Sequence, residues 1–254
     1  MSTTTPAHLA AEQPLPLLIL DFDGTVCLGD GPVLAYAEAI ANQMPEAVQK
    51  VLHDGLASFL AEDPNAPTYK DGYAAVAALA EGYTDPAGRH HAYLASRQRL
   101  ADGTVEISAP DGLASFLDSL AGIAFRVLLT NAPLVGVQES LSKLGLSDSV
   151  DLIIPDARKP AGFTDLIPIL LANKAAHELL SVGDVWINDI DLPAREGCAT
   201  AFIDRFEHRT GAASLTAPRF ELLYDAISDW AHDPAAFIST HPSTSTLLSE
   251  KAPQ

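Results

Sequence analysis

The sequence has few cysteines, few basic residues and no long apolar run. Its two cysteines, Cys27 and Cys198, give no basis for a disulfide framework, and we expect a reducing, cytoplasmic setting. Lys and Arg number 15 against 33 Asp and Glu, which gives a formal net charge of −18. Such a surface repels phosphate backbones and anionic lipids, so nucleic-acid and membrane-surface binding are disfavoured. No stretch approaches the roughly 18 apolar residues of a membrane span.

Both ends of the chain lack a sustained pattern. Residues 1–16 have neither a basic start nor a long apolar core, so they make a poor signal peptide, and we expect a disordered lead-in. Residues 232–254 are rich in Ser, Thr and Pro and are predicted to form a mobile tail. The part between them is long enough for one large domain, or for a domain with a sizeable insertion.

Short apolar runs alternate with helical patterns through most of the chain. Such runs are typical of strands that are buried on both faces of a parallel sheet. The predicted strands are Leu17–Leu20, Phe125–Leu129, Val150–Ile154, Leu179–Gly183 and Thr200–Ile203. The alternation predicts an α/β fold with a Rossmann-like, doubly wound parallel sheet, formed by residues 17–29 and 109–231.

The long segment between the first two predicted strands has no convincing buried strand of its own. Apolar residues recur there at helical spacing, and Thr84-Asp85-Pro86 is a typical helix start. We therefore predict that residues 30–108 form an inserted all-α domain, packed as a bundle of about four helices.

Two acidic residues follow the first predicted strand directly, in Asp21-Phe22-Asp23-Gly24-Thr25. In open α/β sheets, ligands bind just beyond the carboxyl ends of the strands. Two carboxylates so close together repel each other unless a cation or a shared proton intervenes. A turn or a helix cap would account for one Asp and the Gly, but poorly for both acids and the Thr. A functional site is therefore expected here.

Polar residues also follow three of the other predicted strands, at the same edge of the sheet. They are Thr130 and Asn131, then Lys159, then Asp184 and Asp189. Each has a plainer interpretation. Thr130 could simply end its strand, Lys159 could be a solvated loop charge with Arg158 as a rival cation, Asp184 could be a turn residue and Asp189 could cap a helix.

Taken in order, these residues resemble the motifs of the haloacid dehalogenase-like superfamily, most of whose members are magnesium-dependent phosphatases. The resemblance covers residues 17–230 and is strongest at Asp21-Phe22-Asp23-Gly24-Thr25. Two positions depart from it. Val185 stands where the family often has a small polar residue, and Gly162 stands where a second Pro is common. Neither departure removes a catalytic group.

The resemblance implies a role for each acidic residue. Asp21 would be the nucleophile that forms an aspartyl-phosphate, and Asp23 would protonate the leaving oxygen and later activate water. Mg²⁺ would be bound by the carboxylates of Asp21 and Asp184 and by the backbone carbonyl of Asp23. Asp189 would touch the metal or support it.

The same resemblance implies that Thr130 and Asn131 bind the phosphoryl group, and that Lys159 neutralises its developing charge. The implied function is hydrolysis of a small phosphorylated metabolite, because a helical cap that closes over the site leaves limited room. A phosphomutase, a dehalogenase and a non-catalytic phosphoryl-ligand-binding protein are the alternatives. Dehalogenating relatives lack the second acid, so Asp23 favours phosphoryl transfer.

Overall fold

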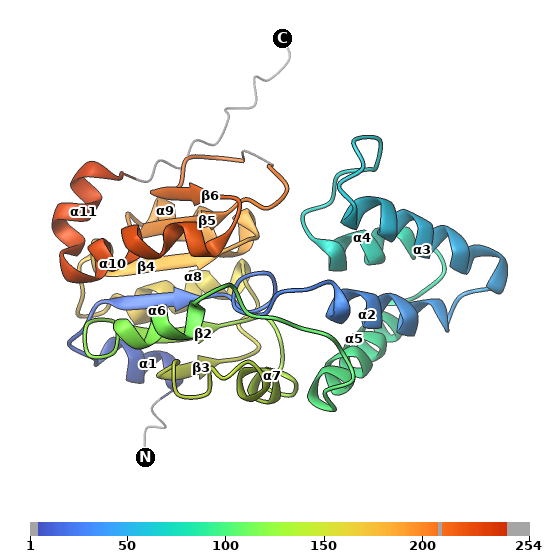
Figure 1. Cartoon of the computed structure of the whole chain (residues 1–254), viewed down its shortest axis with the longest axis horizontal. Coiled ribbons are helices and arrows are strands. Elements are labelled where there is room, and N and C mark those ends of the chain that lie inside the picture. The colour runs from blue at the N-terminus through green and yellow to red at the C-terminus, as the bar shows by residue number, and fades with distance from the viewer. Residues whose placement is uncertain (1–4, 208–209, 243–254) are drawn as a thin grey trace, which may run out of the picture. The chain divides into compact units, whose positions relative to one another are not determined.

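The computed structural model describes residues 5–207 and 210–242. The chain divides into two compact units (Figure 1). The sheet unit comprises residues 1–26, 110–131 and 148–254, and the helical unit comprises residues 27–109 and 132–147. The chain thus passes between the units four times, at 26/27, 109/110, 131/132 and 147/148.

The sheet unit contains a six-stranded, all-parallel sheet with the order β3-β2-β1-β4-β5-β6. The strands are β1 (Leu17–Leu20), β2 (Phe125–Leu129), β3 (Leu152–Ile154), β4 (Leu179–Gly183), β5 (Ala199–Ile203) and β6 (Leu215–Ala217). All residues of β1, β4 and β5 are buried, as their apolar runs predict. The sequence analysis missed β6, a three-residue edge strand whose middle residue is exposed and which therefore lacks an apolar run.

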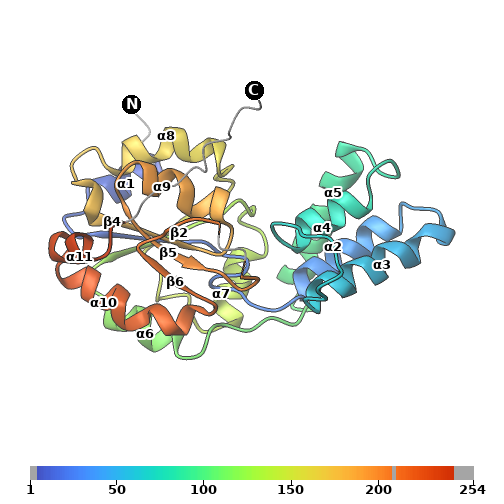
Figure 2. The same ribbon diagram turned by 90° about the horizontal axis from the view of Figure 1, so that it is seen from above.

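Helices cover both faces of this sheet (Figure 2), which confirms the predicted doubly wound architecture. One face carries α1 (Pro6–Ala11), α8 (Ala161–Leu170) and α9 (Asp191–Arg195), and the other carries α6 (Leu113–Ser119), α10 (Tyr224–His232) and α11 (Pro234–Thr240). Three short turns complete the unit: η1 (Ala176–Glu178), η2 (Trp186–Ile190) and η3 (Phe220–Leu223). Apolar side chains of α8, such as Phe163 and Ile167, pack with those of β1 and β2 in a continuous core.

The predicted disordered lead-in is wrong for part of its length. Helix α1 packs against α8, and Ala7 and Ala10 lie in the core of the sheet unit. Lys174 also donates hydrogen bonds from its Nζ to the backbone carbonyls of Gln13 and Leu15, at 2.5 and 2.8 Å. This helix has only six residues, most of them small and apolar, and was too short to give a periodic signal.

The predicted mobile tail is also wrong where the structure describes it. Residues 234–240 form α11, whose first turn is capped by the Asp233 carboxylate accepting from the Ala236 N–H at 3.0 Å. Phe237 is buried and anchors this helix. The remainder of the predicted tail, residues 243–254, lies outside the described residues.

The helical unit contains α2 (Gly31–Ala41), α3 (Glu46–Leu60), α4 (Gly72–Leu79), α5 (Pro86–Ala101) and α7 (Val137–Lys143). The rings of Tyr36, Tyr73 and Tyr93 pack together, with centroids 5.7 to 6.2 Å apart. In the described part of the chain, no helix is both long and apolar enough to cross a membrane.

The helical unit extends beyond the predicted boundaries. Residues 132–147 were assigned to the sheet domain, but α7 packs against α5. Lys143 donates from its Nζ to the carbonyls of Gly103 and Val105, at 3.3 and 3.0 Å. A helix between two strands of one sheet is expected to cover that sheet, so this packing could not be predicted from the sequence.

Candidate active site

The topology gathers the predicted residues at one edge of the sheet. Strands β2, β1 and β4 are neighbours and parallel, so Thr130, Asp21 and Asp184 all follow their carboxyl ends. The Asp21 N–H donates to the Val182 carbonyl at 3.0 Å, which continues the β1–β4 pairing to the first acid. This edge is where ligands bind in sheets of this kind.

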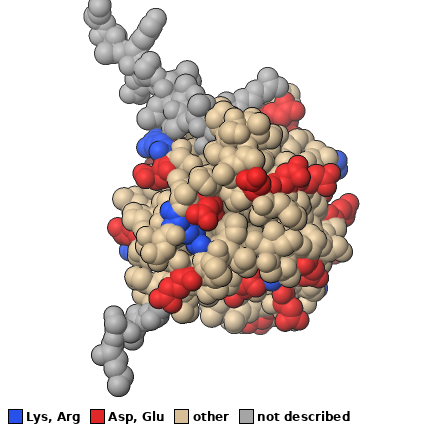
Figure 3. Space-filling view, turned by 90° about the vertical axis from the view of Figure 1, so that its left-hand side faces the viewer, with Lys and Arg blue, Asp and Glu red and all other residues tan. Residues whose placement is uncertain are grey.

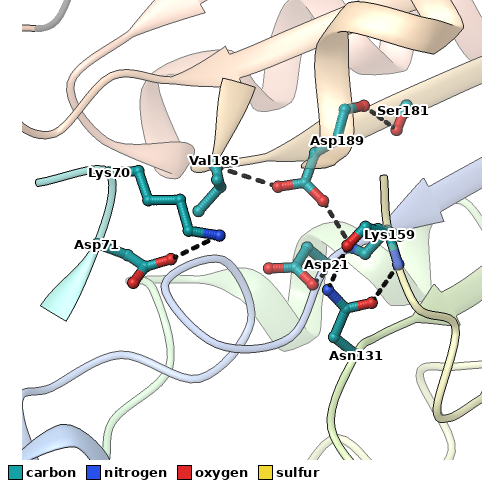
Figure 4. Close-up of polar contacts among 8 residues, drawn as sticks. All are labelled: Asp21, Lys70, Asp71, Asn131, Lys159, Ser181, Val185 and Asp189. Carbon is teal, nitrogen blue, oxygen red and sulfur yellow. Dashed lines mark hydrogen bonds and ion pairs between the residues drawn. The ribbon is translucent and has the colours of Figure 1, made fainter. Parts of the chain in front are cut away.

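Lys159 lies between two of the acids (Figure 4). Its Nζ is 2.8 Å from Asp21 Oδ1 and 2.6 Å from Asp189 Oδ1, and its side chain is only 2% exposed. Burial lowers the pKa of Lys159, but the charges of Asp189 and Asp21 outweigh burial and hold that pKa well above its ordinary value. The rival cation Arg158 is exposed. Lys159 therefore supplies positive charge inside an acidic protein.

The acidic character of the molecule makes this local charge important. Figure 3 shows acidic side chains spread over the face that it displays, with few basic ones among them. The formal net charge of −18 would repel a phosphorylated substrate at long range. An ammonium group at the strand ends supplies local positive charge, which a binding site for an anion needs in a protein with so much negative charge.

Asp189 is held by the turn that follows β4. The Val185 N–H donates to Asp189 Oδ2 at 3.1 Å, and the Ser181 hydroxyl donates to the Asp189 carbonyl at 2.7 Å. A Cβ on Gly183 would lie 2.3 Å from Asp189 Cγ, so the turn folds closely over the end of the strand. Asp189 is almost fully buried, and burial raises the pKa of its carboxyl to about 7.

Three carboxylates converge in a way that suits a hard cation. Asp21, Asp184 and Asp189 each offer an oxygen, and these atoms lie within 4.8 Å of one another. Gly24 has φ +85°, and a Cβ there would lie 2.1 Å from Asp184 Oδ2, so the absent side chain leaves room for this carboxylate. Oxygen donors without Cys or His are the ligands that Mg²⁺ prefers. The residues present therefore fit the predicted metal.

Asp23 lies two residues beyond Asp21, in the loop after β1, and is partly buried. Its carboxylate is not a member of the group of three converging acids. The predicted role of Asp23 is proton transfer rather than metal binding through its side chain.

Thr130 and Asn131 follow β2, but their side chains have different surroundings. Thr130 is buried, its N–H donates to the Ile154 carbonyl at 3.0 Å, and its own carbonyl accepts from the Ala157 N–H at 2.9 Å. Asn131 is exposed. The family resemblance predicts that it binds the substrate. In the structure, its amide group bonds to the main chain of Lys159.

Sequence reasoning missed three residues that shape the site. Ser181 is a polar residue within the buried strand β4, and that position was the only feature of the sequence that could have indicated its contact with Asp189. Phe163 lies beneath the ammonium group of Lys159, which is 5.9 Å from the ring centroid. Gly183 was matched to the family motif beside Asp184, but its part in the close approach of Asp189 was not predicted.

Solved structures with the same fold are found at low sequence identity. YfnB from Bacillus subtilis, described as a HAD-hydrolase bound to magnesium, has a TM-score of 0.57 at 16% identity, covering 85% of this chain and 100% of that chain. A predicted phosphoglycolate phosphatase from Haemophilus somnus has a TM-score of 0.52 at 14% identity, covering 86% and 98%. The chain has the haloacid dehalogenase-like fold. The predicted fold is thereby confirmed.

Dehalogenases share this fold as well. The 2-haloacid dehalogenase from Pseudomonas syringae has a TM-score of 0.50 at 16% identity, covering 85% of this chain and 99% of that chain. No family model and no curated protein matches the sequence. The choice between phosphoryl transfer and dehalogenation therefore depends on the residues of this chain.

Proposed function

We propose that this protein is a Mg²⁺-dependent phosphomonoester hydrolase of the haloacid dehalogenase-like superfamily. The observation that carries the proposal is the convergence of the carboxylates of Asp21, Asp184 and Asp189, two of which, those of Asp21 and Asp189, pair with the buried ammonium group of Lys159. This set combines a nucleophile, cation ligands and a positive charge at one strand edge. It is the chemistry that transfer of a phosphoryl group from an ester requires.

The acidic residues would divide the reaction between them. Asp21 attacks phosphorus to give an aspartyl-phosphate, while Asp23 gives its proton to the leaving oxygen. Asp23, now ionised, then takes a proton from a water molecule that attacks the same phosphorus and releases phosphate. Such proton transfer contributes ~10²–10⁴ in rate.

The other residues would hold the substrate and balance charge. When bound by Asp21, Asp184 and the Asp23 carbonyl, with Asp189 beside them, Mg²⁺ would relieve repulsion between the nucleophile and the phosphoryl oxygens. Lys159 would neutralise charge that develops on those oxygens, and the Thr130 hydroxyl would donate to one of them. That YfnB is described as bound to magnesium supports this choice of ion.

Asp23 supports phosphoryl transfer over carbon–halogen cleavage. A haloacid gives up a halide, which leaves without a proton, whereas an alkoxide leaving group needs one. A general acid two residues after the nucleophile thus has a task in a phosphatase and none in a dehalogenase. A binding protein without turnover would likewise need no such acid.

We further propose a small phosphorylated metabolite as the substrate, with the helical unit supplying selectivity. The test is phosphate release from a panel of phosphorylated metabolites and from a generic aryl phosphate, with Mg²⁺ and after exhaustive chelation. Mg²⁺-dependent release from the aryl phosphate and from a subset of metabolites is expected. Halide release from a haloacid, or phosphate transfer within a substrate without release, would instead indicate a dehalogenase or a mutase.

A further inference from the structure

The side chain of Asn131 bonds to the main chain of Lys159 through both of its polar groups. Its Oδ1 accepts from the Lys159 N–H at 2.5 Å, and its Nδ2 donates to the Lys159 carbonyl at 2.9 Å (Figure 4). This reciprocal pair fixes the peptide groups on both sides of one Cα atom. Because Asn131 is exposed, these bonds rather than burial hold its side chain in place.

The loop that carries Lys159 needs support at this point. Backbone bonds between the strand ends extend the β2–β3 pairing only as far as the Ala157 N–H, which donates to the Thr130 carbonyl. Asp156 and Arg158 then adopt φ of 51° and 54°, the left-handed region that residues with a side chain seldom occupy. Strand pairing ends before Lys159, and the Asn131 side chain continues the lateral bonding where strand pairing stops.

The other end of Lys159 has little freedom. Its Nζ is held at 2.8 Å from Asp21 Oδ1 and 2.6 Å from Asp189 Oδ1. A shift of the main chain would move this ammonium group away from the nucleophile, and misplacement by about 1 Å can cost ~10²-fold in rate. We infer that Asn131 is a positioning residue that acts through Lys159. This inference rests on the proposed function and replaces the role of substrate ligand for Asn131.

Steady-state kinetics of Asn131→Ala provide the first test. A positioning role predicts that kcat for an aryl phosphate falls by ~10-fold, while KM changes by less than about 2-fold. Asn173→Ala is the matched control, because Asn173 is an exposed residue of the same unit in the turn after α8. A rise in KM with kcat unchanged would show that Asn131 binds the substrate directly, and would overturn the inference.

A double-mutant cycle with Lys159→Ala tests whether the loss of kcat in Asn131→Ala depends on Lys159. If Asn131 acts through Lys159, adding Asn131→Ala to Lys159→Ala should lower kcat by less than about 2-fold further. Independent roles would instead make the two losses multiply. Multiplying losses would overturn the inference even if the single variant behaved as expected.

Amide hydrogen exchange tests the contact without any turnover. In substrate-free protein, Asn131→Ala should speed exchange in a peptide covering residues 155–163, since the Lys159 N–H loses its acceptor. Asn173→Ala should leave this peptide unchanged. If the wild-type protein hydrolysed no phosphate ester, the proposed function would fail. The exchange measurement would still show whether the Asn131 side chain holds the main chain at Lys159. Unchanged exchange in Asn131→Ala would refute the positioning role.

Discussion

Lys159 pairs through one ammonium group with two acids of the candidate site, Asp21 and Asp189. Without its ammonium group, the negative charges of two buried or partly buried carboxylates would be less well balanced. These carboxylates would then repel the negative charge of a phosphorylated substrate more strongly. Gly24 matters at the proposed metal site, because its missing side chain lets Asp184 approach the loop after β1.

We predict that Gly24→Ala weakens Mg²⁺ binding at least about 10-fold, because a displaced carboxylate no longer completes the ligand set. A Cβ would lie 2.1 Å from Asp184 Oδ2. Gly122→Ala is the matched control, since Gly122 has φ +76° but nothing within 4 Å of its Cβ position. Both variants carry the backbone strain of a positive φ, roughly 1–2 kcal/mol. Titration calorimetry with Mg²⁺ would refute the argument if the two variants bound the ion equally.

The sequence predicted that several candidate residues lie together because the carboxyl ends of parallel strands share an edge of the sheet. Asp21, Thr130 and Asp184 come together on that basis alone. The contacts of Lys159 with Asn131 and Asp189 could not be predicted from the sequence. They depend on a loop whose backbone is left-handed at Asp156 and Arg158. Positive φ is uncommon for every residue that has a side chain, so the sequence does not predict it at these two positions.

At the scale of the elements, β2 and β3 are tied at the sheet edge by Arg126 and Asp151. The Arg126 backbone N–H, Nε and Nη2 all donate to the Asp151 carboxylate at 2.8 to 2.9 Å, and Nη1 donates to the Leu117 carbonyl at 2.9 Å. Burial raises the pKa of Asp151, but the bonds and charge of Arg126 outweigh burial, and the pKa lies below its ordinary value.

A lowered pKa in the folded state predicts how stability depends on pH. The Asp151 carboxylate stabilises the fold above its ordinary, unfolded-state pKa, and this stability is lost as pH falls through the lower folded-state value. We predict that Asp151→Asn lowers the free energy of unfolding at pH 7 by about 1–2 kcal/mol, with the difference from wild type shrinking below roughly pH 4.

Chemical denaturation at several pH values would measure this difference. Asp54→Asn is the control, because Asp54 pairs with Lys50 on the surface of α3, where both side chains are more than half exposed. Such surface pairs contribute little, so the control should stay within about 0.5 kcal/mol of wild type at every pH. A pH-independent effect of Asp151→Asn would contradict the electrostatic origin.

The elements that sequence reasoning missed have weak patterns of their own. Helices α1 and α11 are only 6 and 7 residues long, and β6 has only 3. Isolated segments of these lengths are not stable in water, so tertiary packing decides whether they form. Strands β1, β2, β4 and β5 have four or five residues each and were predicted because they are buried almost throughout. Strand β3 is as short as β6 and only partly buried, but its apolar run, Leu152-Ile153-Ile154, was enough to predict it.

At the scale of the whole molecule, the helical unit includes residues 132–147 as well as 27–109. We predict that replacing both segments by short linkers reduces selectivity among metabolites more than it reduces hydrolysis of an aryl phosphate. The reason is that the proposed nucleophile Asp21, the proposed cation Lys159 and the proposed metal-site residue Asp189 all belong to the sheet unit. A companion variant that lacks only residues 30–108 would leave α7 without α5 and should be less stable.

The measurement is the ratio of kcat/KM for one metabolite to that for the aryl phosphate. Circular dichroism must first show that each shortened chain retains its folded sheet unit. An unchanged ratio in a folded chain would mean that the helical unit does not determine selectivity.

Asp21 is proposed as the nucleophile of a Mg²⁺-dependent phosphatase, and its substitution tests that role most directly. Asp21→Asn keeps the size of the side chain and an oxygen that can accept from Lys159, so the fold should persist. The decisive measurement is phosphate release from an aryl phosphate by wild type and by this variant, with and without Mg²⁺, alongside circular dichroism. We predict Mg²⁺-dependent release by wild type and a loss of at least ~10³-fold in the folded variant. Comparable release by a folded Asp21→Asn protein, or wild-type release that survives chelation, would contradict the account.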